Sequence, residues 1–205
     1  MKYEPAIDKK TLKLIFGVFL AILVSTCSVA EREVIDNTGP TVPQFNVLSV
    51  RDYLSSALAL AQEWQSDAYL LNVSVNVELP HVKSSNNEVS FEFRSPSNEN
   101  VSLVISCQKT CSSEELTTVR LPQCTPLEIS DSLLESDDAL ALGLKSGGIN
   151  YINGENAYAF MYLERNYPRC NGATIAWRVQ FGNYFTSDQI LFVFDAVSGD
   201  LLEKR

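Results

Sequence analysis

The chain has 205 residues, enough for one large domain or two small ones, and a globular composition with 45% hydrophobic and 10% aromatic residues. Its formal net charge is −9. An acidic surface repels nucleic acid and anionic lipid headgroups, so the charge argues against a nucleic-acid partner. A negative charge also keeps many proteins soluble, so it favours no particular function.

The first 30 residues carry a signal for membrane targeting. Residues 14–24 form an uncharged apolar run that follows several lysines and precedes Glu31, Glu33 and Asp36. Because positive charge stays on the cytoplasmic side, Met1 is expected in the cytoplasm and the chain after about residue 30 across the membrane. The globular part is therefore expected outside the cytoplasm, in the periplasm or at the cell surface.

Three interpretations of this run remain open. It resembles the hydrophobic region of a cleaved secretory signal, with the small-x-small pattern of a cleavage site at residues 28–30. Residues 24–27 resemble a bacterial lipobox whose Cys27 would be lipidated, although Thr26 stands where Gly, Ala or Ser is usual. Residues 14–30 also approach the length of a retained anchor. We expect membrane attachment through residues 14–30 or a lipid on Cys27, with secretion as the alternative.

Residues 31–48 are predicted to be a tether, because Pro and Gly interrupt them and no apolar period is present. Residues 49–106 then have the pattern of one helix and three strands. Ser49 has the spacing of an N-cap, and apolar residues from Leu54 to Trp64 share one helical face. Alternating residues predict strands at 69–78, 89–94 and 101–106.

The cysteines predict disulfides. Cys107, Cys111 and Cys124 lie in a connector, residues 107–131, and Cys170 lies in a later loop. Outside the cytoplasm such cysteines are normally oxidised. Three pairings are possible, and we favour Cys107–Cys111 with Cys124–Cys170, because the second bridge would tie the connector to the following module. A four-cysteine zinc site and a Cys-x-x-x-Cys redox centre are less favoured alternatives, since the spacing fits neither well.

Residues 132–205 repeat the order of the first module. A helix is expected from Ser136, its N-cap, to Gly147 and Gly148, with strands at 157–164, 174–181 and 189–202. The sequence therefore predicts an α+β fold of two tandem α-β-β-β modules, each an antiparallel sheet covered by one helix. These modules would follow an N-terminal signal or anchor helix within residues 1–30.

Residues 136–202 resemble the PepSY family. The helix opens with Ser-Asp-Asp-Ala, and the chain closes with the turn Asp-Ala-Val-Ser-Gly-Asp at 195–200, in which Ser198 and Asp200 replace the family's Thr and Glu. The resemblance implies a cystatin-like, extracytoplasmic module with a proposed role in binding or inhibiting peptidases, and it implies no catalytic residues. The turn also has a structural reason, because Asp195 can accept backbone N–H groups and Gly199 can adopt positive φ.

No motif predicts catalysis, a cofactor or a metal. The chain has one histidine, His81, and lacks the nucleophile-elbow, zinc-protease and phosphate-loop patterns. Aromatic residues such as Tyr158, Phe160 and Tyr162 could form a binding face, but on alternating strands we expect them to belong to the core or to cross-strand pairs. Tyr184 and Phe185 lie in a turn, where burial is not required, and are the predicted contact residues.

These patterns predict a non-enzymatic, membrane-attached protein that binds another protein and regulates a peptidase or an envelope complex. One alternative is a single-pass accessory subunit of a larger membrane complex, in which the anchor matters most. Another is a small secreted hydrolase that uses paired carboxylates, which nothing in the spacing of the acidic residues specifically supports.

Overall fold

The computed structural model describes residues 45–79, 82, 86–117, 124–165 and 172–205, which all belong to one compact unit, Val42–Arg205. The apolar run at 14–30, Cys27, His81 and Cys170 lie outside the described residues, so the expectations about them stay predictions. Within the described part of the chain, no helix is both long and apolar enough to cross a membrane.

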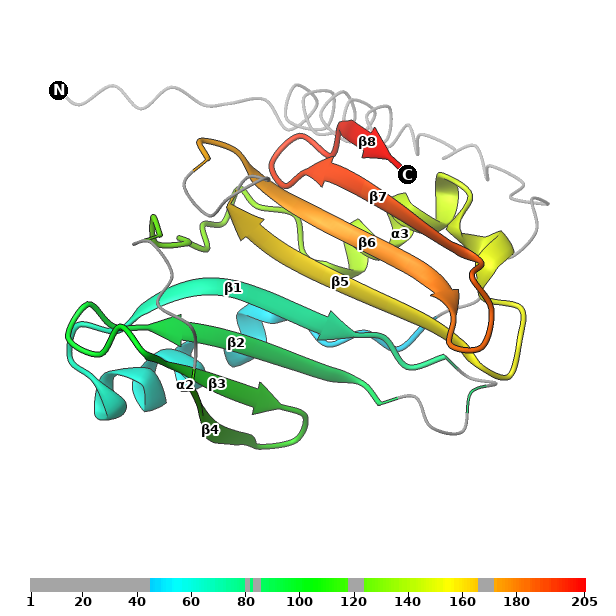
Figure 1. The fold of residues 1–205 in the computed structure, drawn as a ribbon. Coiled ribbons are helices and arrows are strands. Elements are labelled where there is room, and N and C mark those ends of the chain that lie inside the picture. The colour runs from blue at the N-terminus through cyan, green and yellow to red at the C-terminus, as the bar shows by residue number, and fades with distance from the viewer. Residues whose placement is uncertain (1–44, 80–81, 83–85, 118–123, 166–171) are drawn as a thin grey trace, which may run out of the picture. The chain divides into compact units, whose positions relative to one another are not determined.

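An antiparallel sheet of eight strands dominates the structure (Figure 1). The strand order is β4-β3-β2-β1-β5-β6-β7-β8, so the first four strands lead from the centre to one edge and the last four lead to the other. The strands are β1 (Tyr69–Asn76), β2 (Glu88–Arg94), β3 (Val101–Cys107), β4 (Cys111–Thr117), β5 (Ala157–Arg165), β6 (Ile175–Asn183), β7 (Gln189–Asp195) and β8 (Leu201–Lys204).

This sheet corrects the expected fold of two tandem α+β modules. β1 and β5 pair antiparallel from Asn72 with Glu164 to Asn76 with Phe160, and so join both halves in one sheet. The described part of the chain is therefore mainly β, with two short α-helices. Two separate sheets would leave an edge of β1 and an edge of β5 unpaired, whereas pairing them satisfies both rows of backbone groups. Alternation along a strand indicates its buried face but not the strand that lies beside it.

Both helices cover the same face of the sheet. α2 (Val50–Trp64) contacts β2, β3 and β4, while α3 (Ser136–Lys145) contacts β6 and is followed by the 3-10 helix η1 (Gly148–Tyr151). Figure 1 shows α2 and α3 behind the sheet. Ser49 is the N-cap of α2, as predicted, and its hydroxyl accepts the N–H of Asp52 at 3.4 Å.

The start of α3 differs from the prediction that Ser136 is its N-cap. Glu135 holds that position, and the Ser136 hydroxyl instead donates to the carbonyl of Leu48 at 2.6 Å. The Glu135 carboxylate accepts the hydroxyl of Ser49 and the N–H of Val50, each at 3.1 Å. These contacts tie the start of α3 to the start of α2, which a pattern within one helix cannot indicate.

The core lies between the sheet and the two helices. At the junction of the halves, Val75 pairs with Met161 and Val73 with Leu163, and all four side chains are buried. One hydrophobic core therefore continues beneath β1 and β5. Its largest fully buried side chains include Trp177, Phe91, Phe93, Phe181, Phe192 and Phe194.

Two strands differ from the sequence prediction. β4 lies within the expected connector and pairs with β3 from Val101 with Thr117 to Cys107 with Cys111. Almost all of its residues are exposed, so it lacks the apolar alternation that indicates a strand. β8 follows the turn at 195–200 in which the last predicted strand was expected to end, and it was not predicted as a strand of its own.

The turn before β8 confirms the structural reasoning about residues 195–200. Oδ1 of Asp195 accepts the N–H groups of Ser198 and Val197, each at 2.9 Å, and Gly199 adopts a φ of +76°. Hydrogen bonds from these two N–H groups stabilise the ionised carboxylate and hold the pKa of Asp195 below its ordinary value of 3.8.

Candidate interaction face

The face of the sheet opposite α2 and α3 is the candidate functional site. No described helix covers this open face (Figure 1). Side chains alternate along a strand, so the residues between the core positions project from it. In β5 these residues are Tyr158, Phe160, Tyr162 and Glu164, which pair with Gly182, Gln180, Arg178 and Ala176 of β6.

Aromatic side chains follow one another along β5 on the open face. We call Tyr158, Phe160, Tyr162 and the adjacent Tyr184 the aromatic row. The rings of Phe160 and Tyr162 meet edge to face with centroids 4.3 Å apart, and those of Tyr158 and Tyr184 lie 4.9 Å apart. Tyr162 is 40% exposed and Tyr184 is 70% exposed. Of the two expected environments for aromatic residues of this strand, the core is therefore excluded for Tyr162.

Gly182 provides the space in which Tyr158 lies. A Cβ at Gly182 would come within 2.7 Å of the phenol oxygen of Tyr158, its partner across the ladder. This oxygen accepts from Nε2 of Gln180 at 2.9 Å and donates to Oε1 of Gln189 at 3.3 Å. Gln180 also donates to Gln189 at 3.0 Å. These contacts fix the Tyr158 ring before any partner binds, which lowers the entropic cost of binding.

Tyr184 and Phe185, the predicted contact residues, lie in the turn between β6 and β7. Phe185 is 80% exposed. The backbone is nevertheless held, because the N–H of Tyr184 donates to the carbonyl of Asn156 at 3.0 Å and that of Phe185 donates to Oδ1 of Asn183 at 2.9 Å. Large exposed aromatic side chains on an ordered backbone are typical of contact surfaces. Their contact role stays a prediction.

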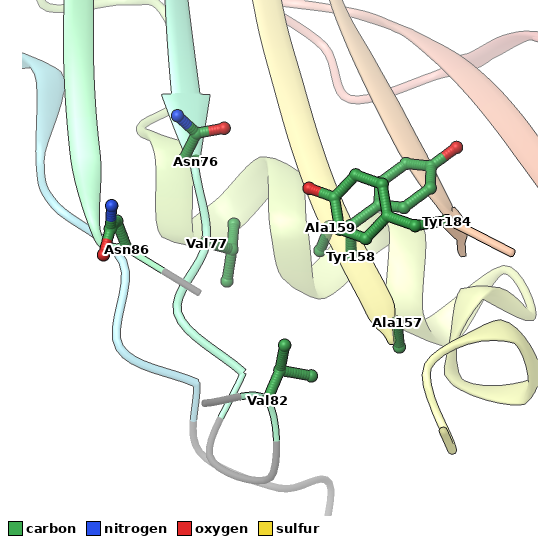
Figure 2. Close-up of a pocket in the computed structure, with 8 residues that line it drawn as sticks. All are labelled: Asn76, Val77, Val82, Asn86, Ala157, Tyr158, Ala159 and Tyr184. Carbon is green, nitrogen blue, oxygen red and sulfur yellow. The ribbon is translucent and has the colours of Figure 1, made fainter. Parts of the chain in front are cut away.

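A pocket of about 180 Å³ lies beside the aromatic row. Figure 2 shows the rings of Tyr158 and Tyr184 on one side of it and Asn76 and Asn86 on the other. Its remaining described lining residues are Val77, Val82, Ala157 and Ala159, so none of the described residues that line it is charged. Sites for small molecules usually enclose about 300 Å³ or more, so this pocket suits a single neutral side chain or ring.

Charged residues on the open face near Tyr162 are paired. The guanidinium of Arg178 contacts the carboxylate of Glu164 at 3.0 Å, and that of Arg94 lies 3.5 Å from Glu92. Burial, followed by the negative charge of Glu164, raises the pKa of the Tyr162 phenol. Tyr162 therefore presents a neutral hydroxyl group at physiological pH.

The structure also decides part of the cysteine chemistry. Cys107 and Cys111 form the predicted disulfide between β3 and β4, which removes both as zinc ligands. Cys124 is also disulfide-bonded. Because its partner is not among the described residues, the pairing with Cys170 stays a prediction. In the described ranges, no group of three or more His, Cys, Asp or Glu side chains is arranged to hold a metal.

Sequence reasoning found the exposed turn and considered a binding face of aromatic residues, but it favoured the core or cross-strand pairs for those of β5. The segment Ala-Tyr-Ala-Phe-Met-Tyr-Leu, residues 157–163, is apolar on both faces of a strand, so alternation alone cannot decide which face is buried. The smaller and aliphatic set faces the core, and the aromatic set faces outward. The hydroxyl groups of two of the three aromatic residues were the available signal, because a phenol tolerates exposure better than a phenyl ring does.

No protein-family model and no curated protein matches this sequence. Among solved structures, the crystal structure of a "putative lipoprotein" from Clostridium difficile 630 is similar to this chain, with a TM-score of 0.48 and 12% sequence identity. The similarity covers 80% of this chain and 95% of the other. The resemblance to the PepSY family stays a prediction that no family model supports.

Proposed function

We propose that this chain is a non-catalytic protein, attached to a membrane and exposed outside the cytoplasm, that binds another protein through its open face. The observation that carries the proposal is the aromatic row, continued by Phe185, on a face that the described helices leave bare. Exposed tyrosines anchor many protein interfaces, because they bury a large apolar area at low entropic cost and retain a hydroxyl for hydrogen bonding.

A protein partner fits this surface better than a small substrate. The pocket beside Tyr158 is small, the described residues that line it carry no charge, and it opens next to exposed rings. It suits one side chain of a partner, while the aromatic row supplies the surrounding contact area. A peptidase or an envelope complex is the candidate partner class, on the basis of the resemblance to the PepSY family.

The expected location supports the same proposal. The lysines before residues 14–30 favour a cytoplasmic Met1, and the apolar run or a lipid on Cys27 would hold the globular part at the membrane surface. Intact mass of the protein from membranes tests this part. A mass that begins at Met1 or at a lipidated Cys27 supports attachment, whereas one that begins at Glu31 shows a secreted protein and overturns it.

Affinity capture with matched surface variants tests the contact surface. The full chain is crosslinked in membranes of its own organism, solubilised and captured, and the proteins recovered are quantified. The double variant Tyr184→Ala, Phe185→Ala is compared with Val197→Ala, which truncates another exposed apolar residue in the turn before β8. The recovered amount of a specific partner should fall about tenfold or more with the double variant and stay unchanged with Val197→Ala. Failure to recover any specific partner, or equal recovery with both variants, would contradict the proposal.

A further inference from the structure

The two edge strands of the described sheet differ in how well they are protected against further pairing. β8 spans only Leu201–Lys204, contains a lysine and pairs with β7 through an irregular register. These are features that protect natural sheet edges. β4 spans Cys111–Thr117 and pairs with β3 at every position without a register shift. It contains no proline or lysine, its charged side chains are both acidic (Glu114 and Glu115), and six of its seven residues are exposed.

The outer side of β4 carries backbone groups that pair with no other described residue. In an antiparallel ladder every second residue directs its N–H and C=O away from the neighbouring strand. The Cα atoms of Cys107 and Cys111 lie 4.1 Å apart, a distance typical of a cross-strand pair whose two residues do not hydrogen-bond to each other. In the neighbouring pair toward the turn, the N–H of Gln108 donates to the carbonyl of Thr110, as the alternation of an antiparallel ladder requires. Ser113 and Glu115 therefore direct their N–H groups outward. No backbone hydrogen bond from another described residue reaches this side of β4.

The side chains of β4 determine which strand could pair there. Glu114 projects on the open face beside Leu116, which is 41% exposed, and the carboxylate of Glu114 has no partner among the described residues. Glu115 projects on the helix side, where it accepts the indole N–H of Trp64 at 3.0 Å. Both glutamates are exposed. A basic strand would place its charges against these carboxylates, and such cross-strand pairs are favourable.

A second copy of this chain fits the same edge poorly. Glu114 is the middle residue of β4, so a symmetric antiparallel pairing of two copies would place Glu114 directly opposite its equivalent. Like charges in directly opposite positions destabilise a ladder. The same carboxylates that favour a basic strand therefore disfavour self-association through β4.

We propose that β4 is a docking edge to which an extended, basic segment of a partner protein adds as a further antiparallel or parallel strand. Main-chain hydrogen bonds to the outward groups of Ser113 and Glu115 would supply the pairing, and Glu114 would select basic residues. β4 lies four strand spacings from β5, roughly 19 Å, so a short segment bound there does not reach the aromatic row. The inference is therefore independent of the proposed contact through Tyr184 and Phe185.

Peptide titration of the full chain in detergent tests this proposal. The probe is a capped peptide of about eight residues that alternates Lys and Thr, and its control alternates Glu and Thr. The basic peptide should bind and should slow amide hydrogen exchange at Ser113 and Glu115, whereas the acidic peptide should do neither. Absence of binding, or binding without protection of these two amides, would overturn the proposal.

Two substitutions separate strand pairing from attraction by charge alone. Ser113→Pro removes an outward N–H without removing a hydrogen bond to β3, and it should weaken binding of the basic peptide about tenfold. Ser113→Ala keeps the N–H and should bind the basic peptide as the wild type does. Glu114→Lys should weaken binding of the basic peptide and create binding of the acidic one. This variant tests the proposal even if Ser113→Pro does not fold. Normal binding of the basic peptide to folded Ser113→Pro, or an unchanged preference in Glu114→Lys, would refute docking at β4. The variant Tyr184→Ala, Phe185→Ala should bind the peptide normally.

Discussion

At the scale of single residues, hydrogen bonds of side-chain carboxylates and amides fix one turn and one exposed ring of the sheet. Asp195 fixes the turn before β8 through the N–H groups of Ser198 and Val197. Gln180 and Gln189 fix Tyr158 on the open face. Loss of the Asp195 carboxylate would therefore change the geometry of the turn, and loss of the Gln180 or Gln189 amide would change the position of the Tyr158 ring.

Asp195 makes the stability of the fold depend on pH in acid. Its pKa is lower in the folded state than the ordinary value of 3.8, so it stabilises the fold when ionised, above that value, and this contribution is lost as pH falls through the folded pKa. Asp195→Asn keeps an oxygen acceptor for both N–H groups but carries no charge. We expect the difference in unfolding free energy between wild type and Asp195→Asn to shrink as the pH falls from about 5 to about 2.

Urea unfolding at a series of pH values measures that difference. Because Asn retains the acceptor, a loss of the turn geometry itself would appear as a difference that does not change with pH. Such a constant difference would show that the charge on Asp195 contributes nothing, and would contradict the prediction.

At the scale of elements, the approach of α3 and η1 to β6 depends on residues without a side chain. A Cβ at Gly143 would lie 2.8 Å from Phe181, and one at Gly148 would lie 2.2 Å from the same ring. Phe181 is fully buried in the core. The glycines therefore allow the helical segments to pack directly on the ring, and the sequence showed only a helix exit at Gly147 and Gly148.

We predict that Gly148→Ala destabilises the protein by about 1–3 kcal/mol, because the added methyl group overpacks the Phe181 site. Combining it with Phe181→Leu should cost less than the sum of the two single changes, since the smaller residue makes room. The control is Gly147→Ala, where a Cβ meets no atom within 4 Å but the φ of +115° is strained for alanine. Its cost should add to that of Phe181→Leu. Urea unfolding measures these free energies. If Gly147→Ala and Gly148→Ala depart from additivity with Phe181→Leu by the same amount, the steric explanation is wrong.

The hairpins show the limits of pattern reasoning at this scale. Strands β2, β3 and β6 were predicted close to their observed bounds because each has one buried face and therefore an alternating sequence. β5 was also predicted close to its bounds, although its sequence is apolar on both faces. β4 was not predicted because it lies at an edge of the sheet, where neither of its faces is well covered and its sequence therefore does not alternate. The strand is formed by its ladder with β3 and by the Cys107–Cys111 disulfide, not by any hydrophobic period of its own.

At the scale of the whole molecule, the pairing of β1 with β5 makes the two halves one cooperative structure. The core continues from Val73 and Val75 to Met161 and Leu163, so neither half can open without exposing the other. Two tandem modules would instead unfold as separate units. The unfolding transition therefore distinguishes the observed sheet from the fold that the repeated order of elements predicted.

The two tryptophans of the chain report on the two halves. Trp64 ends α2, and Trp177 is buried in β6 with its indole N–H donating to the carbonyl of Leu134 at 2.9 Å. In protein labelled with 5-fluorotryptophan, the two fluorine signals should lose their native intensity at the same urea concentration. Different midpoints for the two signals would indicate independent modules and would contradict a single cooperative sheet.

The sequence by itself determined those features that depend on neighbours along the chain. Alternation placed most strands, Ser49 marked the start of α2, and the spacing of Asp195 and Gly199 predicted the turn before β8. The close pair Cys107 and Cys111 predicted a disulfide that the structure contains. Each of these is set by interactions across a few residues, which the printed order of residues displays directly.

Only the tertiary structure decided which strands are neighbours and which face of β5 is exposed. Val75 and Met161 are far apart in the chain, and nothing in either segment indicates that they pair across the centre of one sheet. The apolar character of both faces of β5 left its orientation open until the helices were placed on one side. The aromatic row and the free edge at β4 therefore exist as surfaces only because burial of the common core leaves them outside.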